Sequence, residues 1–184
     1  MSTERKMRAD AASNRARILE AARELLSSTS ELPMNAVAKA AGVGQGTLYR
    51  NFPTRDALLT EVYRADVEQL VASATALLDE HDAATALRHW LDNVADYARV
   101  KRGVLAALEP NSGHELTASH TGSIGEAIDL LLDAGKREGT IRADVESHEV
   151  LILLGFLSRL DETEAAERAH HILDVVFNGL RTRG

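Results

Sequence analysis

Gln45, Thr47 and Arg50 lie close together in the chain and carry side chains that donate and accept hydrogen bonds. Side chains of these types bind the edges of bases in the grooves of duplex DNA. Arg55 follows them, and a guanidinium beside the main-chain N–H groups of a helix start suits a phosphate. These residue types therefore indicate nucleic-acid binding, provided that neighbouring helices bring them to one face.

Three glycines, Gly42, Gly44 and Gly46, stand directly before and among these residues. They allow three interpretations: a phosphate cradle, a flexible loop, or a turn between two helices. A phosphate cradle needs a preceding strand and a following Lys-Ser/Thr pair, and the sequence has neither. Apolar residues keep helical spacing on both sides, which argues against a flexible loop. We therefore predict a helix-turn-helix, with Gly42 ending its first helix and Val43 filling the core at the turn.

The other N-terminal helices are predicted from their caps and breaks. A first helix is expected from a cap at Ser13 or Asn14 to about Ser28, because apolar residues recur there at helical spacing. The helices that flank the turn, and the one after them, are expected at 34–41, 45–51 and from 55 to near 80. Residues 1–13 contain Arg5, Lys6 and Arg8 without apolar periodicity, so we expect a disordered segment or, alternatively, an arm that contacts DNA.

The composition favours a soluble helical protein. Of the 184 residues, 45% are hydrophobic but only 4% are aromatic, and Ala and Leu dominate the apolar set. There is no cysteine, which excludes disulfides and thiolate metal sites. The spacing of His114 and His120, or of His170 and His171, does not suit a metal ion, and we expect neither metal nor cofactor. No apolar run reaches the roughly 18 residues of a membrane span, and the N-terminus lacks a signal peptide, so we expect a cytoplasmic protein.

The charge is distributed unevenly along the chain. The total of −7 combines an excess of three positive charges in residues 1–64 with an excess of ten negative charges in residues 65–184. This asymmetry is expected if the N-terminal part binds a polyanion and the remainder does not.

The stretch from Ile18 to Leu59 resembles the DNA-binding domain of the TetR family of bacterial transcriptional regulators. The motifs are VAKAAGV at 37–43, GTLYRNF at 46–52 and TRDALL at 54–59. Two positions depart from the common pattern: Gly44 replaces a capping serine, and Arg55 replaces a frequent lysine. A fainter resemblance covers residues 134–145, where many such regulators close one helix before the pair that forms the dimer.

The resemblance implies an all-α fold, with an arm and a three-helix DNA-binding domain at 1–54 and a helical effector and dimerisation domain at 55–184. It implies binding to duplex DNA, and it places the hydroxyl of Tyr49 on a backbone phosphate. The residues that we expect to contact DNA are Met34, Asn35, Gln45, Gly46, Thr47, Tyr49, Arg50, Thr54 and Arg55.

The C-terminal part is expected to hold an effector pocket between helices. Helices are predicted at about 84–101, near Leu105 and at about 116–138, with polar residues beside apolar stripes. For each polar residue taken by itself, a satisfied position in the core or at its rim is the favoured interpretation. The pocket candidates are Trp90, Asn93, Tyr97, His120 and Ile124.

The last two helices, expected at about 147–160 and 164–181, are apolar nearly all round. In a chain of this size a second copy is the natural cover for such helices. The resemblance likewise implies a homodimer, whose two recognition helices would bind a palindromic operator. The expected interface residues are Leu151, Leu154, Ile172, Val176, Phe177 and Leu180.

We therefore expect a ligand-responsive repressor that an unidentified small molecule releases from its operator. A DNA-binding regulator controlled by a protein partner is the closest alternative. An all-helical enzyme is a distant third, because no nucleotide fingerprint, metal spacing or cysteine nucleophile is present.

Overall fold

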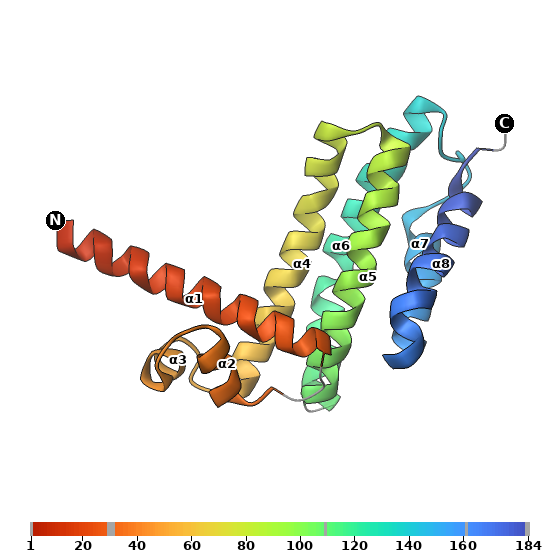
Figure 1. The fold of residues 1–184 in the computed structure, drawn as a ribbon. Helices are drawn as coiled ribbons and strands as arrows, with labels where there is room; N and C mark the ends of the chain where they lie inside the picture. The colour runs from red at the N-terminus through yellow and green to blue at the C-terminus, as the bar shows by residue number, and fades with distance from the viewer. Residues whose placement is uncertain (1, 29–31, 109, 161, 183–184) are drawn as a thin grey trace. The chain divides into compact units, whose positions relative to one another are not determined.

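The computed structural model describes residues 2–28, 32–108, 110–160 and 162–182 (Figure 1). Within these ranges the chain forms α-helices, one short 3-10 helix and a single isolated β-bridge between Ile141 and Arg181. The fold is all-α, as expected. Among the described residues, no helix has a stretch long and apolar enough to cross a bilayer.

The elements follow one another along the chain as α1 to α8, with the 3-10 helix η1 before the last. Their bounds are α1 Ser2–Ser28, α2 Met34–Ala40, α3 Gln45–Asn51, α4 Arg55–Glu80, α5 Ala83–Ala107, α6 Pro110–Glu138, α7 Ser147–Leu154, η1 Gly155–Arg159 and α8 Glu162–Leu180. The predicted bounds of α3 and α4 are confirmed, and α2 ends one residue earlier than expected.

The expected start of the first helix and the expected disorder of residues 1–13 are wrong, because α1 already begins at Ser2. The segment before Ser13 is rich in good helix formers and contains neither proline nor glycine. Periodicity could not show this, since the apolar residues of this segment do not recur at helical spacing. The side chains of residues 1–9, including the three basic residues of the expected arm, lie outside the described part.

The prediction of a separate short helix near Leu105 is also wrong, because α5 continues to Ala107 and α6 begins at Pro110. Gly103 lies within α5. The expected helix at 147–160 is divided, since α7 ends at Leu154 and η1 begins at Gly155.

Contacts divide the chain into two compact units, one of residues 1–65 with 100–116 and one of residues 66–99 with 117–184. The division falls inside α4, whereas the sequence suggested a functional boundary at 54/55, which stays a prediction. In the first unit, α2 and α3 contact each other and both contact α1. Their shared core consists of Ile18, Ala22, Val37, Leu48 and Phe52, each at most 2% exposed.

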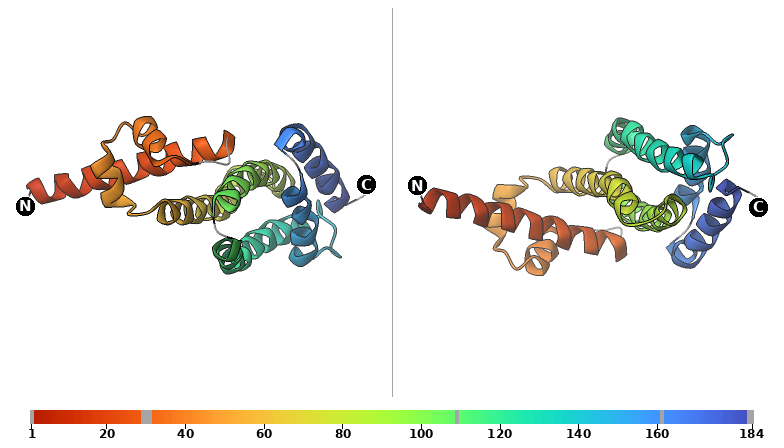
Figure 2. Two further views of the ribbon diagram at one scale, coloured as in Figure 1. Left: turned by 90° about the horizontal axis from the view of Figure 1, so that it is seen from below. Right: turned by 90° about the horizontal axis from the view of Figure 1, so that it is seen from above.

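In the second unit, α5 runs alongside α6 in each view (Figure 2). Trp90, Leu87 and Leu91 of α5 and Leu131 of α6 are fully buried in its core. The end of α8 is tied to the segment after α6, because Arg142 N–H donates to the Leu180 carbonyl at 2.9 Å. Arg88 of α5 adds an ion pair to Asp174 of α8 at 2.6 Å.

Candidate nucleic-acid interface

The start of α2, the exposed side of α3 and the start of α4 surround an open groove of about 540 Å³. It brings together five of the nine residues that the sequence predicted to contact DNA. The lining residues are Leu32, Pro33, Met34, Asn35, Gln45, Tyr49 and Arg55. Leu32 and Pro33 were not predicted, because their apolar side chains carry no signal for DNA binding.

The groove depends on the turn between α2 and α3, where Gly42 has φ +62°. The Gly42 N–H donates to the Lys39 carbonyl at 3.1 Å, and the Val43 N–H donates to the Ala38 carbonyl at 3.0 Å. This pair of hydrogen bonds is the Schellman motif, which satisfies the last carbonyls of a helix and needs a left-handed residue. The predicted role of Gly42 is confirmed, while Val43 is half-buried at the turn.

Arg17 of α1 holds the same turn from the other side. Its Nη2 donates to the carbonyl oxygens of Ala41 and, at 2.9 Å, of Gly42. A Cβ atom on Gly42 would lie 2.8 Å from that Nη2 and would displace the end of the Arg17 side chain, while the left-handed φ itself favours glycine. This contact could not be predicted from the sequence, because residues 17 and 42 are far apart in the chain.

The side chains expected on the DNA side of α3 are open to solvent. Tyr49 is 48% exposed, which leaves its hydroxyl available for a phosphate instead of packing its ring in the core. Gln45 and Arg50 are also exposed, and Arg50 Nη2 donates to Thr47 Oγ1 at 3.1 Å. Arg50 and Thr47 therefore present one linked polar group, although neither lines the groove.

Two glycines, Gly44 and Gly46, flank the first residue of α3. Gly44 is its N-cap, and no side chain caps the helix there, as the missing serine predicts. A Cβ atom on Gly46, one residue into α3, would meet nothing within 4 Å. The packing of the free protein therefore does not require glycine at position 46.

At the start of α4, the Thr54 hydroxyl oxygen accepts the Ala57 N–H at 3.1 Å. Thr54 thus caps α4. Because the Ala57 N–H is used in this bond, it is not available to bind a phosphate at the start of α4. Arg55 is exposed beside this cap and points its charge to the groove edge.

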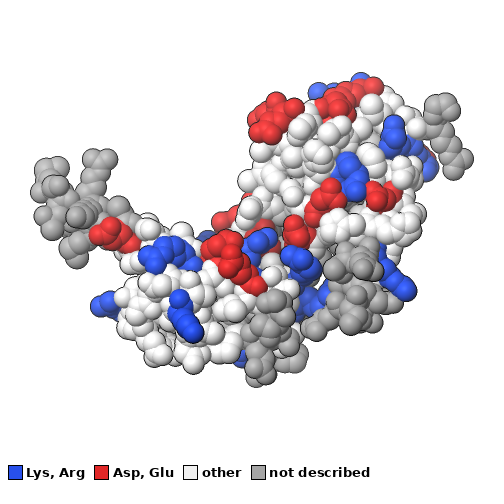
Figure 3. Space-filling model, viewed as in Figure 1, with Lys and Arg blue, Asp and Glu red and all other residues white. Residues whose placement is uncertain are grey.

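The electrostatics of this region favour an anion. Residues 32–55 contain no Asp or Glu, and they include three basic residues, Lys39, Arg50 and Arg55. Blue side chains stand out on the surface over α2 and α3 (Figure 3). Lys39 is an exposed cation in the last turn of α2 that the candidate set omitted. The excess of three positive charges found over residues 1–64 is therefore already present within residues 32–55, where it favours the binding of DNA.

The pocket candidates occupy different environments within the second unit. Trp90 is fully buried, and its indole N–H donates to the Leu70 carbonyl at 3.0 Å. Tyr97 is buried as well, whereas His120 and Ile124 are half-buried. Asn93 is exposed and donates to Ser73 Oγ at 3.3 Å. Trp90 thus has a structural role, and ligand binding by these five residues stays a prediction. Within the described part, no group of three or more His, Asp or Glu could hold a metal ion.

The interface candidates on α7 and α8 are partly covered within one chain. Leu154 and Leu180 are buried, at 9% and 3% exposed, and the other four are half-buried. Three apolar residues outside the candidate set are more exposed, namely Ile152 at 64%, Leu153 at 48% and Val175 at 59%. Sequence alone could not rank these positions, because the helices are apolar on every side.

A helix-turn-helix with an exposed recognition helix, on an all-α chain, defines a DNA-binding transcriptional regulator. Residues 18–62 match the family described as bacterial regulatory proteins, tetR family. Residues 82–182 match the family described as transcriptional regulator SbtR-like, C-terminal domain. The chain belongs to the TetR family, whose members are regulators and not enzymes.

Solved structures and curated relatives agree with this assignment. A TetR transcriptional regulator from Streptomyces coelicolor, SCO0520, is 36% identical, covers 92% of this chain and 99% of its own, and superposes with a TM-score of 0.79. A TetR regulatory protein from Mycobacterium vanbaalenii is 33% identical over 96% of this chain and 99% of its own, with a TM-score of 0.78. The HTH-type transcriptional regulator SAB2452 of Staphylococcus aureus is 28% identical over 73% of this chain and 74% of its own length.

Proposed function

We propose that this regulator is a homodimeric repressor that binds a palindromic operator through the groove of α2, α3 and α4. The observation that supports this use of the groove is the convergence of Asn35, Gln45, Tyr49 and Arg55 on a groove whose lining contains no acidic residue. Gln45 and Thr47, at the N-terminal end of α3, are placed to read base edges, while Tyr49 and Arg55 bind phosphates. Such a protein acts in the cytoplasm, where it meets the chromosome.

The dimer in this proposal is built on α7 and α8. Ile172, Val175 and Val176 follow the i, i+3, i+4 spacing along α8, which gives one apolar stripe. Ile152 and Leu153 of α7 add exposed apolar surface, and α7 runs beside α8 in Figure 1. A second copy that covers these side chains would remove them from water on both chains.

The proposal includes release of the operator by a small molecule bound among the C-terminal helices. A ligand shifts a conformational equilibrium only by its difference in affinity for the two states. The effector must therefore bind more tightly when the two recognition helices have a spacing that does not fit the operator. Aromatic residues make up only 4% of the chain, which favours a flexible apolar ligand over a planar one.

A screen of apolar and cationic compounds by thermal shift tests the effector, because a ligand that binds the native state stabilises it by mass action. Each hit is then added to the protein on a duplex selected by the wild-type chain from random DNA. A hit that raises the melting temperature and releases the duplex supports the proposal. Hits that leave the complex intact, or the absence of hits, would favour control by a protein partner.

A further inference from the structure

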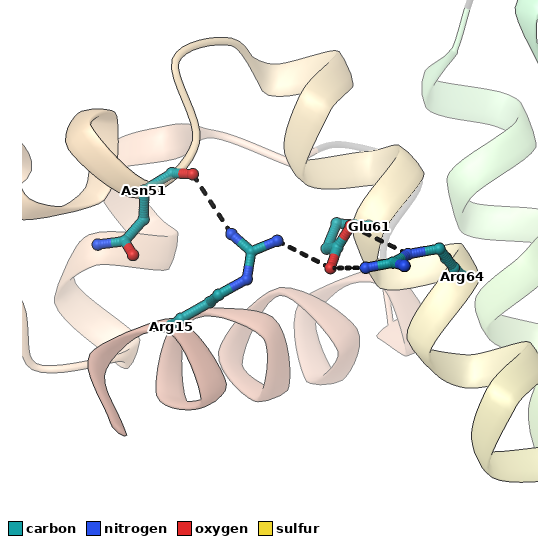
Figure 4. A network of polar contacts seen from close by, with 4 residues as sticks. All are labelled: Arg15, Asn51, Glu61 and Arg64. Carbon is teal, nitrogen blue, oxygen red and sulfur yellow. Dashed lines mark hydrogen bonds and ion pairs between the residues drawn. The ribbon is translucent and has the colours of Figure 1, made fainter. Parts of the chain in front are cut away.

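Arg15 of α1 reaches the rear of the recognition helix, away from the groove. Its Nη2 lies 2.8 Å from Glu61 Oε1, and its guanidinium carbon lies 4.5 Å from the centroid of the Phe52 ring. Its Nη1 makes a longer contact of 3.5 Å with the main-chain oxygen of Asn51. One side chain thus connects α1 with Phe52 and, as Figure 4 shows, with Asn51 at the end of α3 and with Glu61 of α4.

Glu61 is itself held in place by a second arginine. Arg64 Nη2 lies 2.6 Å from Oε1 and Arg64 Nε lies 3.2 Å from Oε2, so the guanidinium binds both carboxylate oxygens. The Glu61 side chain is only 19% exposed. The hydrogen bonds from Arg64, and then those from Arg15, hold the pKa of the Glu61 carboxyl below its usual value. The carboxylate that fixes Arg15 is therefore charged at neutral pH.

The recognition helix needs support of this kind because it is weak by itself. It has seven residues, far fewer than an isolated helix needs, and its N-cap Gly44 provides no side-chain hydrogen bond. Leu48 and Phe52 anchor one side of it in the core. Arg15 supports the opposite end from Gln45, where a positive charge also suits the negative end of the helix dipole.

We propose that Arg15, fixed by Glu61, is a positioning residue that sets the orientation of α3 for reading bases without contacting DNA itself. The inference rests on the proposed use of the α2, α3 and α4 groove. Loss of either partner lets the short helix shift, so the contacts of Gln45 and Thr47 with bases weaken. Contacts with phosphates tolerate such a shift better, because they depend less on geometry.

Glu61→Gln gives the sharpest test, because the loss of a negative charge and the loss of a positioning contact for Arg15 have opposite effects on DNA binding. Removal of a negative charge near DNA would by itself strengthen binding to every duplex. If Glu61 positions Arg15, the variant instead loses roughly tenfold in the ratio of affinities for the selected and a scrambled duplex, a loss similar to that of one base contact. Asp10→Asn, which removes the same charge from an exposed site on α1, should leave that ratio unchanged.

Arg15→Ala and Arg15→Lys complete the experiment. Arg15→Ala should lower the same ratio roughly tenfold, with the salt dependence on the scrambled duplex unchanged, because no phosphate contact is lost. Arg15→Lys keeps the ion pair but loses the planar group over Phe52, so it should recover part of the ratio. Circular dichroism and thermal melts of each variant establish that it is folded.

Two results would overturn the inference. One is a Glu61→Gln ratio equal to or above that of the wild type, and the other is a salt slope for Arg15→Ala that falls by about one, as for a phosphate contact. A wild-type chain that selects no sequence from random DNA would instead overturn the proposed function, and this inference with it.

Discussion

Gly103 of α5 lies against the main-chain carbonyl of Leu26 in α1, so closely that a Cβ atom added at Gly103 would overlap the Leu26 oxygen. Both residues belong to the first compact unit, and Leu26 is buried. Glycine within a helix ordinarily costs about 1 kcal/mol relative to alanine. The close approach explains why glycine stands at this position of a long helix.

Gly103→Ala should therefore destabilise the protein, even though alanine is the better helix former. The displacement of main-chain atoms typically costs about 1–3 kcal/mol, which exceeds the gain in helix propensity. Gly122→Ala is the matched control, since a Cβ atom at that position of α6 meets nothing within 4 Å. In urea denaturation the control should gain up to about 1 kcal/mol. Equal stabilisation of both variants would show that Gly103 is not a packing site.

Gly46→Ala should separate stability from DNA binding. Gly46 lies in α3 with open space where a Cβ atom would stand, so alanine should raise the stability by up to about 1 kcal/mol. If DNA approaches the main chain there, the added methyl group should weaken binding to every duplex. Thermal melts and binding isotherms measure the two effects. Unchanged affinity would place position 46 outside the interface.

The carboxyl of Glu61 should contribute to the pH dependence of stability. Its pKa lies below the usual 4.5, chiefly because Arg64 donates hydrogen bonds to it, with Arg15 adding to the effect and burial opposing it. A lowered pKa stabilises the native state above pH 4.5, and this contribution disappears as pH falls through the lowered value. Glu61→Gln should thus unfold more easily than the wild type at pH 7, with the difference shrinking in acid. A difference that stays constant down to about pH 3 would contradict the role of the charge.

Val175→Glu should yield a monomer without unfolding the chain. Val175 is 59% exposed in one chain, so the charge meets water in the monomer and becomes buried only in a dimer. Ala72→Glu places the same charge on an exposed site of α4 as a control. Sedimentation at micromolar concentration should show a dimer for the wild type and the control. A dimeric Val175→Glu variant would exclude this face from the interface.

The helix boundaries were predicted correctly where they depend only on residues at the boundary itself. Gly42 determines the turn between α2 and α3, because it acts on its own main chain. The true start of α1 was missed, since propensity without periodicity is a weaker signal. The continuity of α5 was missed, and the close approach of Gly103 to Leu26 could not be predicted because the two residues are far apart in the chain.

The residues of the candidate site were likewise predicted only in part. The types of Gln45 and Arg55 indicated DNA binding, the family resemblance added Tyr49, and the structure places all three on one groove. The residues that support the groove from behind, Arg15 and Arg17, were not identified. Their partners are main-chain oxygens and a carboxylate from other helices, and no local pattern in the sequence records such contacts.

The central claim, that the groove of α2, α3 and α4 binds DNA, is tested most directly by the salt dependence of binding for the wild type and Arg55→Ala. Arg55 is exposed at the groove edge, so its loss should not affect folding. We predict weaker binding to the selected and the scrambled duplex alike, with the slope of log affinity against log salt reduced in magnitude by about one. An Arg55→Ala variant with the affinity and salt slope of the wild type on both duplexes would contradict the claim.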